Sequence, residues 1–562
     1  MRLLSNLKTA SKGIAIGKAF VVERQELNAD LYRITPGQIN QEIDKFKKAV
    51  KEATNQIEFL ASNSDLFKAH LELVKDITLC EGVINKITVN HLNAQQALDK
   101  TIAELCSIFN NMEDEYLRER SDDIIDIRTR LMRILKGTGN TGFDRIKEDV
   151  IIITENLVLS DTSYLDLTHI LGFATEYGGI TSHVSIIART LELPALVGVK
   201  DLMKSIHSGD YLILDASAGK LIVNPDEDTI KEYRLLQGTY EEKKQNLTKL
   251  SYLPATTMDG KAVKICANVG SLEDVKKAAA FHIDSIGLFR TEFLYMNNTH
   301  FPTEEEQFTV YKEAALLCKG DLIIRTLDIG GDKSLPYFTI PPEENPFLGW
   351  RAIRISLEMT DIFKTQLRAI LRASAFGKVK IMYPMIISLE ELQKANEILE
   401  ECKAQLLLEN IPFDCTIPTG IMIETPAAVM CAGHLAKHAD FFSIGTNDLT
   451  QYTLAIDRGN QRISSLFDSF HPAVLQSIKR IIEAAHTNGI TAGMCGELAG
   501  DEKAAALLLG FGLDEFSMSP GEGANIKNIL RSLSYEKSKE LADHILTLPT
   551  VDQVREYLFS HS

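Results

Sequence analysis

The stretch 440–451 reads Asp-Phe-Phe-Ser-Ile-Gly-Thr-Asn-Asp-Leu-Thr-Gln and shows the unit from which the second half of the chain is built. Residues 441–444 form a short apolar run that is typical of a buried strand, and Gly445 permits a tight turn after it. The polar residues that follow begin a helical pattern, so the stretch predicts a strand, a turn and a helix in that order. Asn447 and Asp448 would stand where the strand ends.

The same order of strand, turn and helix recurs between residue 255 and about residue 535. Strands are predicted at residues 263–267, 285–289, 322–325, 379–382, 420–423, 441–444, 490–494 and 514–518. Mostly helical patterns separate these eight strands, and eight such units over this length predict a TIM (β/α)8 barrel. We assign residues 255–562 to this barrel.

Polar residues gather at the downstream ends of these strands, which is the face where barrel enzymes build their active sites. The set consists of Arg290, Arg325, Glu424, Asp448, Arg458 and Cys495. Arginines grip carboxylate and phosphate groups in a bidentate manner, and two carboxylates offer hard oxygen ligands for one Mg²⁺. A lone thiol can exchange a proton. Together these groups predict a small, doubly anionic substrate that is held on a metal ion.

A histidine motif precedes the barrel at residues 178–189, Gly-Gly-Ile-Thr-Ser-His-Val-Ser-Ile-Ile-Ala-Arg. Its glycines permit close approach of the backbone to a ligand, and Thr181 or Ser182 is a good helix N-cap. His183 would then lie in the first turn of a helix, where free N–H groups and the helix dipole favour an anion and disfavour a protonated ring. A neutral imidazole at such a site suits phosphoryl transfer. The motif taken alone is equally compatible with a capping loop that contains an incidental histidine.

The first half of the chain predicts an α/β domain with a helical insertion. Strand patterns at the N-terminus return after residue 149, whereas residues 34–138 contain almost no glycine or proline and repeat apolar residues at helical spacing. We therefore predict one α/β domain from residues 1–24 and 145–225, with a bundle of about four helices inserted at residues 25–144. The charged segment 226–254 predicts a linker helix between two bodies that move relative to each other.

The composition is that of an ordinary soluble globular protein, with 45% hydrophobic and 24% charged residues among 562. A formal net charge of −17 argues against nucleic acid as a partner, because nucleic acid requires a basic surface. The eight cysteines contain no Cys-x-x-Cys pair, and no segment reads as a signal peptide or a membrane span. We therefore expect a cytoplasmic protein without membrane insertion, zinc site or disulfide framework.

The motif Gly-Gly-x-Thr-Ser-His, followed by Ala188 and Arg189, resembles the phosphohistidine signature of the enzymes that use phosphoenolpyruvate (PEP). This family includes enzyme I of the bacterial sugar phosphotransferase system, pyruvate phosphate dikinase and PEP synthase. The stretch Ser160-Asp161-Thr162 is also similar to a family motif. The resemblance to enzyme I is nearly letter for letter at residues 344–351, 371–374, 440–451 and 493–497, and it runs over essentially the whole chain.

The resemblance implies a role for each motif residue. His183 would receive the phosphoryl group of PEP and pass it to a histidine of the small phosphocarrier protein HPr, while Cys495 would donate a proton to the enolate of pyruvate. The residues that would support the phosphohistidine are Thr162, Gly178, Gly179 and Arg189. PEP would be bound by Arg290, Arg325, Lys333, Arg351, Asn447, Asp448 and Arg458, and Mg²⁺ would be held by Glu424 and Asp448.

Two interfaces are implied as well. The helical insertion would dock HPr through His70, Leu73 and Leu79, and the barrel would form a homodimer. The segment 75–78, Lys-Asp-Ile-Thr, departs from a run that is usually more acidic in the family. Ile180 and Val184 replace a basic and a small hydroxylated residue of the usual motif, and Val184 removes one hydrogen bond to a phosphate while leaving the nucleophile in place.

The same residues also bear on other assignments within and outside the family. The dikinase and the synthase carry a nucleotide-binding domain before the histidine, and the chain has no Gly-x-x-x-x-Gly-Lys-Ser/Thr loop there. A nitrogen-regulatory paralogue of enzyme I would keep all these motifs but normally adds a sensor domain, for which we expect no room. A regulatory protein that docks partners without turning over PEP predicts damage to the catalytic set, and every member of that set is present.

Overall fold

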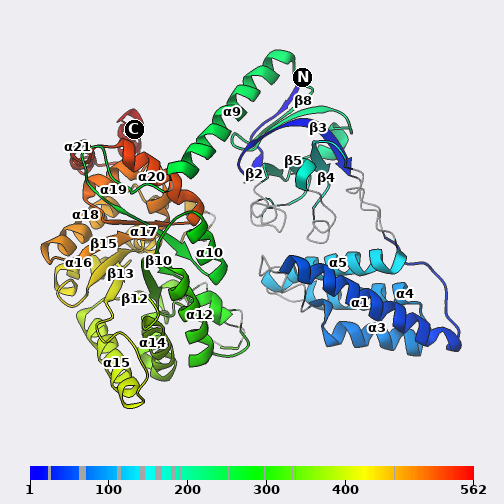
Figure 1. Ribbon diagram of the computed structural model, residues 1–562, viewed down its shortest axis with the longest axis horizontal. Helices are drawn as coiled ribbons and strands as arrows, with labels where there is room; N and C mark the ends of the chain where they lie inside the picture. Colours follow the sequence, from blue (N-terminus) through cyan, green and yellow to red (C-terminus); the bar gives the residue numbers. More distant parts are fainter. Residues whose placement is uncertain are drawn as a thin grey trace. The chain divides into compact units, whose positions relative to one another are not determined.

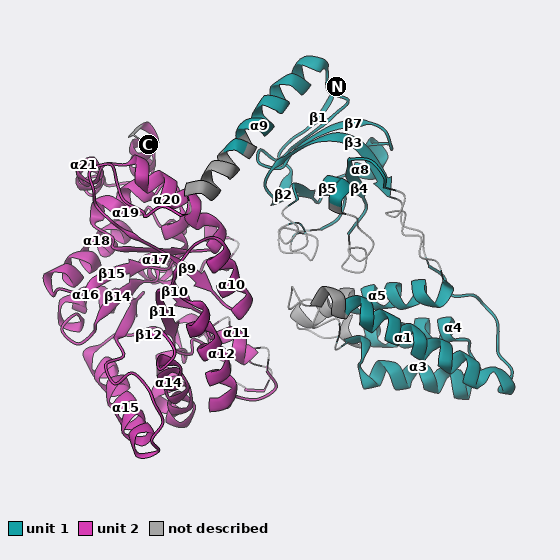
Figure 2. Cartoon of the chain, in the orientation of Figure 1, with its two compact units in different colours: residues 1–243 teal, residues 244–562 magenta. Residues whose placement is uncertain are grey.

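The computed structural model describes most of the chain in two compact units, residues 1–243 and 244–562 (Figure 2). The described residues are 1–22, 27–61, 71, 73–110, 115–137, 146–157, 167–178, 185, 188, 193–250, 252–296, 298–331, 333, 335, 337–338, 340–460 and 462–561. Each unit has its own hydrophobic core, so each is considered by itself below.

An eight-stranded sheet forms the α/β part of the first unit, in the strand order β1-β8-β7-β3-β4-β5-β6-β2. Its strands are β1 (Arg2–Leu4), β2 (Lys8–Ser11), β3 (Ile14–Val22), β4 (Val150–Thr154), β5 (Ile170–Thr175), β6 (Ala195–Val197), β7 (Tyr211–Asp215) and β8 (Lys220–Val223). The N-terminal strand β3 lies between β4, which is parallel to it, and β7, which is antiparallel (Figure 1). Strands from both sides of the helical segment therefore share one sheet, with the short elements η3 (Leu167–His169) and α8 (Leu202–Ser205) between its later strands.

The helical segment contains η1 (Pro36–Gln38), α1 (Ile39–Ala61), α3 (Ile77–Asn90), α4 (Ala94–Asn110) and α5 (Glu115–Lys136). Its core is built from apolar residues at helical spacing, as the sequence periodicity predicts. In α3 the buried residues Leu79, Val83 and Ile87 are four apart and so lie on one face of the helix. Asp76 caps this helix by accepting a hydrogen bond from the Leu79 N–H at 3.0 Å.

The helix predicted after the sheet is α9 (Glu227–Leu250). Its first turns pack on the sheet, where Ile230 and Tyr233 contact a small cluster that contains Ile213 and Ile222. Gln237 also donates a hydrogen bond to the Ile14 carbonyl at 2.9 Å. The N-terminal half of α9 is therefore anchored on the α/β sheet.

The second unit is a closed barrel of eight parallel strands, which confirms the predicted TIM-barrel fold. The strands are β9 (Lys264–Val269), β10 (Ser285–Phe289), β11 (Asp321–Arg325), β12 (Lys378–Tyr383), β13 (Thr419–Ile423), β14 (Phe441–Ile444), β15 (Thr491–Met494) and β16 (Glu515–Met518). All eight overlap the strands predicted from the sequence. Helices surround the strands (Figure 1).

The helices of this unit follow the strands in chain order. They are α10 (Leu272–Ala280), α11 (Glu292–Met296), α12 (Glu304–Leu317), α13 (Ile353–Glu358), α14 (Thr360–Ser374), α15 (Leu389–Leu408), α16 (Pro426–Leu435), α17 (Thr446–Leu454), α18 (Pro472–Thr487), α19 (Ala505–Phe511), α20 (Gly523–Ser532), α21 (Tyr535–Ile545) and α22 (Val551–His561), with the short turns η4 (Pro346–Leu348), η5 (Ser464–Leu466), η6 (Glu497–Gly500) and η7 (Pro520–Glu522). None of the helices in the described part of the chain combines the length and the apolar character that crossing a lipid bilayer requires.

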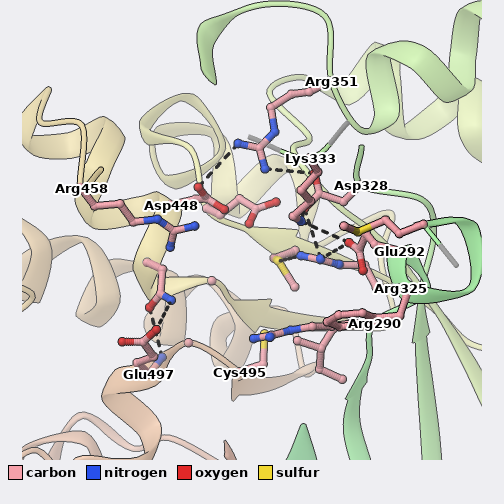
Figure 3. A pocket seen from close by; sticks show the side chains of 18 residues that line it. Arg290, Glu292, Arg325, Asp328, Lys333, Arg351, Asp448, Arg458, Cys495 and Glu497 are labelled. Carbon is pink, nitrogen blue, oxygen red and sulfur yellow. Dashed lines mark hydrogen bonds and ion pairs between the residues drawn. The ribbon is translucent and has the colours of Figure 1, made fainter. Parts of the chain in front are cut away.

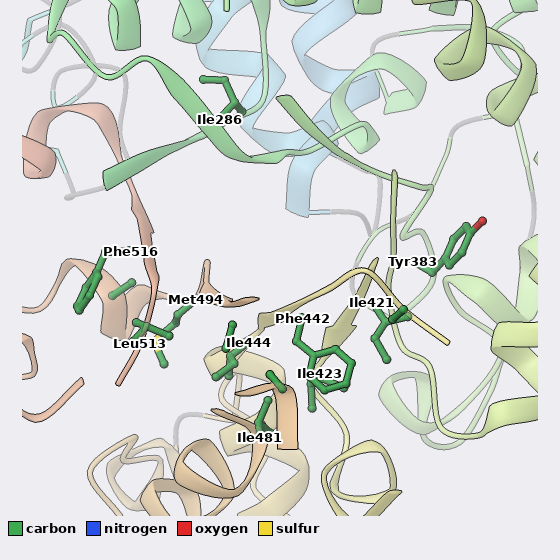
Figure 4. Close-up of a cluster of buried hydrophobic side chains, with 14 of the residues drawn as sticks. Ile286, Tyr383, Ile421, Ile423, Phe442, Ile444, Ile481, Met494, Leu513 and Phe516 are labelled. Carbon is green, nitrogen blue, oxygen red and sulfur yellow. The ribbon is translucent and has the colours of Figure 1, made fainter. Parts of the chain in front are cut away.

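Successive side chains along each strand point to opposite sides of the barrel wall, and they therefore form two separate hydrophobic clusters. Residues such as Ile421, Ile423 and Phe442 belong to the large core that includes the helix residue Ile481 (Figure 4). The residues between them, which point to the opposite side of the strand, form a smaller cluster of Leu288, Ile323, Met382, Met422, Phe441 and Cys495. The smaller cluster therefore fills the barrel interior and brings Cys495 to the inner face.

Candidate active site

A pocket of about 540 Å³ lies at the downstream ends of the barrel strands. It is lined by Leu288, Arg290, Glu292, Phe293, Met296, Arg325, Asp328, Lys333, Arg351, Met422, Glu424, Gly445, Asn447, Asp448, Arg458, Cys495, Gly496 and Glu497 (Figure 3). All the barrel residues for which the sequence predicted a site role are among them. The fold thus brings together side chains that are more than 200 positions apart in the chain.

Two glycines allow the strand ends to approach closely enough to form the pocket floor. A Cβ atom on Gly496 would lie 1.9 Å from the Thr446 hydroxyl oxygen, and one on Gly445 would lie 2.8 Å from a carboxylate oxygen of Glu424. The backbone N–H groups of Cys495 and Gly496 both donate to the Ile444 carbonyl, at 3.1 and 3.3 Å. Any larger residue at either glycine would displace the side chains that surround the pocket.

Three cations of the pocket are held by two buried carboxylates. Asp328 accepts from Lys333 at 2.7 Å and from Arg351 at 3.0 Å, and it lies 3.2 Å from Arg325. Glu292 also pairs with Arg325, and Lys333 lies 3.3 Å from the same carboxylate (Figure 3). Burial alone would raise the pKa of Asp328, but the three cations lower it well below its ordinary range. These cations are therefore oriented before any ligand enters.

Two other arginines of the pocket differ from this group. Arg290 and Arg458 are exposed, and neither has an ion-pair partner among the described residues. Arg290 follows β10 and extends toward Cys495 (Figure 3). Since no carboxylate of the described residues pairs with these two guanidinium groups, both suit the binding of an anion from solution.

Glu424 and Asp448 form a pair of carboxylates on the inner side of the pocket. Burial, followed by the charges of Asp448 and Asp328, raises the pKa of Glu424 to about 8. One oxygen of Glu424 accepts the Met385 N–H at 2.6 Å, and Met385 adopts a left-handed backbone conformation (φ 56°) to present that group. The buried Oδ1 atom of Asp448 has no hydrogen-bond partner among the described residues. The nearest positive charge to this pair is Arg351, whose Nη1 atom forms an ion pair with Oδ1 of Asp448 at 3.6 Å without a hydrogen bond.

Cys495 lies directly after β15 and is almost completely buried. Burial raises the pKa of its thiol, although the Ser443 hydroxyl donates a hydrogen bond to the sulfur at 3.2 Å. The thiol therefore keeps its proton near neutral pH, which is the state required of a proton donor. The neighbouring apolar side chains Leu288 and Met422 also line the pocket.

Comparison with known proteins identifies the family. Three family models match the chain: the N-terminal domain of PEP-utilising enzymes at residues 8–120, their mobile domain at 146–219 and their PEP-binding domain at 244–535. A phosphoenolpyruvate-protein phosphotransferase of Haemophilus influenzae is 45% identical over 98% of this chain and 99% of its own length. The chain belongs to the phosphoenolpyruvate-protein phosphotransferase family.

Two further relatives agree with this assignment. The phosphoenolpyruvate-protein phosphotransferase of Buchnera aphidicola subsp. Schizaphis graminum is 45% identical, with 98% of each chain covered. That of Priestia megaterium is 42% identical, again with 98% of each chain covered. The model of the PEP-binding domain, residues 244–535, includes every residue that lines the pocket.

Sequence reasoning assigned no role to Glu292, Asp328 and Glu497, which the structure places in the same pocket. Glu292 and Asp328 orient the buried cations, and Glu497 accepts a hydrogen bond from the Asn447 amide at 3.0 Å. All three lie at strand ends, so their position in the sequence could have indicated that they belong to the site. Position alone does not distinguish a carboxylate that orients a cation from one that binds a ligand.

The predicted residues of the first unit are only partly described. His183, Thr162, Gly179 and Arg189 lie outside the described residues, as do His70, Ile180 and Val184. Gly178 is described and has φ 117°, a conformation that favours glycine.

The two leucines of the predicted docking site are both described. Leu73 is partly buried against the helical core, and Leu79 is 4% exposed within it. Leu79 lies on the inner face of α3, in line with Val83 and Ile87, and contributes to the core of the helical segment, while its contact with a partner stays a prediction.

Proposed function

We propose that the chain transfers the phosphoryl group of PEP through a phosphohistidine at His183 to a histidine of HPr, with release of pyruvate. The observation that carries this proposal is one pocket that contains oriented cations, two arginines with no ion-pair partner among the described residues, two adjacent carboxylates and a buried thiol. PEP has a carboxylate, a phosphate and a carbon that must be protonated, and each needs one of these groups. Pyruvate formation then draws the transfer forward.

The two classes of cation suit the two anionic groups of PEP. Arg290 and Arg458 have no protein counter-ion among the described residues and can each bind a carboxylate or a phosphate. Arg325, Lys333 and Arg351 are already oriented by buried acids and add positive charge without a large reorganisation cost. The Asn447 side chain is held by Glu497 at the pocket wall and contributes a polar contact.

Glu424 and Asp448 are the residues that would hold Mg²⁺. The raised pKa of Glu424 and the unpartnered oxygen of Asp448 fit a pair that receives a cation. Two carboxylates would leave several coordination positions for water and substrate oxygens, as Mg²⁺ prefers. When bound, the ion would neutralise negative charge that develops on the substrate.

Phosphoryl transfer requires the lone pair of a His183 ring nitrogen to attack the phosphorus atom in line with the bridging oxygen. The bond between phosphorus and that oxygen breaks, and its electron pair leaves as the enolate of pyruvate. The enolate carbon then takes the proton of the Cys495 thiol, and the thiolate regains a proton from solvent. Leu288 and Met422, which lie in the same cluster as Cys495, would contact the apolar methylene carbon and exclude water from it.

A mobile histidine domain would carry the phosphoryl group from the barrel to a second acceptor. We assign residues 1–24 and 145–225 to this domain, residues 25–144 to the HPr-binding bundle, residues 226–254 to the linker and residues 255–562 to the barrel, through which the chain would dimerise. Two alternative functions remain. One is a nitrogen-regulatory paralogue, which would use another carrier, and the other is a regulatory protein that does not turn over PEP.

Intact mass after incubation with PEP and Mg²⁺ tests the first half-reaction. We expect one acid-labile phosphoryl group on the wild-type chain and none on His183→Ala. Subsequent addition of HPr should remove that group, whereas removal only by a nitrogen-branch carrier would favour the paralogue. Absence of any gain in mass, with folded protein, would favour the regulatory alternative.

A further inference from the structure

The hydroxyl group of Tyr452 connects the pocket to the loop that carries Arg351. Tyr452 lies on α17, one helical turn after Asp448. Its oxygen accepts a hydrogen bond from Nη1 of Arg351 at 3.0 Å and donates one to the Phe347 carbonyl. Burial raises the pKa of this phenol, so the oxygen keeps the proton that it donates. Tyr452 does not itself line the pocket.

Arg351 also forms a longer ion pair with Asp448, at a distance too great for a hydrogen bond (Figure 3). Its Nη1 atom lies 3.6 Å from Oδ1 of Asp448, whereas charge-assisted hydrogen bonds of this type measure about 2.7–2.9 Å. That oxygen is buried and has no hydrogen-bond partner among the described residues. The other terminal nitrogen of Arg351 is bound to Asp328 at 3.0 Å (Figure 3). Tyr452 therefore takes one of the two N–H groups of Nη1 at hydrogen-bond distance, whereas Asp448 stays at the longer ion-pair distance from the same nitrogen.

We infer that Tyr452 is a positioning residue that holds Arg351 away from Asp448 and so keeps one oxygen of Asp448 free for a divalent cation. The inference rests on the proposed metal site at Glu424 and Asp448. Without the phenol oxygen, a shift of Nη1 by less than 1 Å toward Asp448 would turn this ion pair into a charge-assisted hydrogen bond. Arg351 would then compete with the cation for the same carboxylate.

The same hydroxyl restrains the loop that carries Arg351. Phe347 belongs to η4 (Pro346–Leu348), and the Trp350 N–H donates to Glu343 at 2.9 Å within this loop. The Ala352 N–H donates to the Ile329 carbonyl at 2.9 Å, which joins the end of the loop to the segment after β11. Arg351 is thus positioned by its backbone and by Tyr452. The phenol oxygen determines whether Nη1 forms its hydrogen bond with Tyr452 or with Asp448.

Substitution of Tyr452 by Phe removes only the oxygen, and the barrel offers a matched control. The hydroxyl of Tyr383 is also buried but has no hydrogen-bond partner among the described residues, so Tyr383→Phe removes an oxygen without removing a bond. Binding of Mn²⁺, measured without PEP by the electron paramagnetic resonance of the free ion, serves as the probe because Mn²⁺ accepts the same oxygen ligands as Mg²⁺. We expect Tyr452→Phe to weaken Mn²⁺ binding roughly fivefold, the ratio that corresponds to one ordinary hydrogen bond, and Tyr383→Phe to leave it unchanged.

A double variant separates this competition from general loosening of the site. In an Arg351→Met background the competing cation is absent, so adding Tyr452→Phe should change Mn²⁺ affinity no further. Wild-type affinity in Tyr452→Phe, or an equal loss in both backgrounds, would overturn the inference while leaving the metal site intact. Mn²⁺ binding that persists unchanged in Asp448→Asn would instead remove the proposed metal site, and this inference with it.

Discussion

The two ends of the barrel both carry clusters of charged side chains, but only one of them satisfies its own charges. At the upstream end, Lys264 pairs with Asp321 at 2.5 Å and with Glu515 at 3.0 Å, and Lys380 lies 3.0 Å from Asp321. These side chains are partly exposed, and none of their polar atoms is buried without a partner. The upstream cluster is therefore complete without a ligand.

The downstream end has buried polar atoms without partners. Within the described residues these include Oε2 of Glu292, Nε of Arg325, Nε of Arg351 and Oδ1 of Asp448. An unpaired buried polar group costs free energy, so a stable fold keeps such groups only where something else compensates them. The difference teaches that the charge content of a strand end does not mark a site, whereas incomplete pairing does.

Removal of one buried thiol at each end of the barrel should give the largest difference in activity between two variants. Cys495→Ala is expected to lower the rate of pyruvate formation by about 10²–10⁴-fold, because the enolate carbon loses its proton donor. Cys266 is also a buried barrel cysteine, but it lies near the upstream cluster, so Cys266→Ala should leave the rate unchanged. Exchange of the pyruvate methyl protons with D₂O, followed by NMR, measures the same step in reverse. Equal exchange rates in the two variants would contradict the assignment of Cys495.

Removal of one carboxylate charge at each end should give the next contrast. Asp328→Asn leaves two buried arginines and the partly exposed Lys333 without their shared acceptor, and we expect a loss of about 3–5 kcal/mol in the free energy of unfolding. Asp321→Asn removes a partly exposed acceptor at the other end and should cost at most about 1 kcal/mol. Trp350 is the single tryptophan of the chain and belongs to the second unit, so its fluorescence during denaturation reports on that unit. Similar losses in the two variants would show that pairing at the downstream end is not special.

The pH dependence of the thiol should give the smallest effect. Because burial raises the pKa of Cys495 above its ordinary 9.0, the protonated form required for pyruvate formation persists from about pH 7 to pH 9. The forward rate should therefore show no decline from this group in that range, while methyl-proton exchange from pyruvate, which needs the thiolate, should rise with pH. A pH profile of both reactions in wild type and Cys495→Ser tests this. If the forward rate of the wild type alone declined as the pH rose from 7 to 9, the direction of the pKa change would be contradicted.

The sequence predicted the barrel, and the residues that it named at the strand ends line one pocket. Each buried strand, such as residues 441–444, is an apolar run bounded by a turn residue, and a parallel sheet brings all downstream ends to one face. Residues as distant as Arg290 and Cys495 could therefore be placed together before any coordinates were considered. The burial of Leu79 could not be predicted in the same way, because a leucine at helical spacing belongs to the core only if another element covers that face of α3.

The order of residues by itself determined the alternation of strands and helices, the family motifs and the set of side chains at the pocket. Only the tertiary structure decided which of those side chains neutralise one another. Arg351 and Arg458 are chemically identical in the sequence, yet one is bound by Asp328 and Tyr452 and the other has no ion-pair partner among the described residues. The physical reason is that local sequence sets periodicity and turn geometry, while charge pairing depends on distances of a few ångströms between segments far apart in the chain.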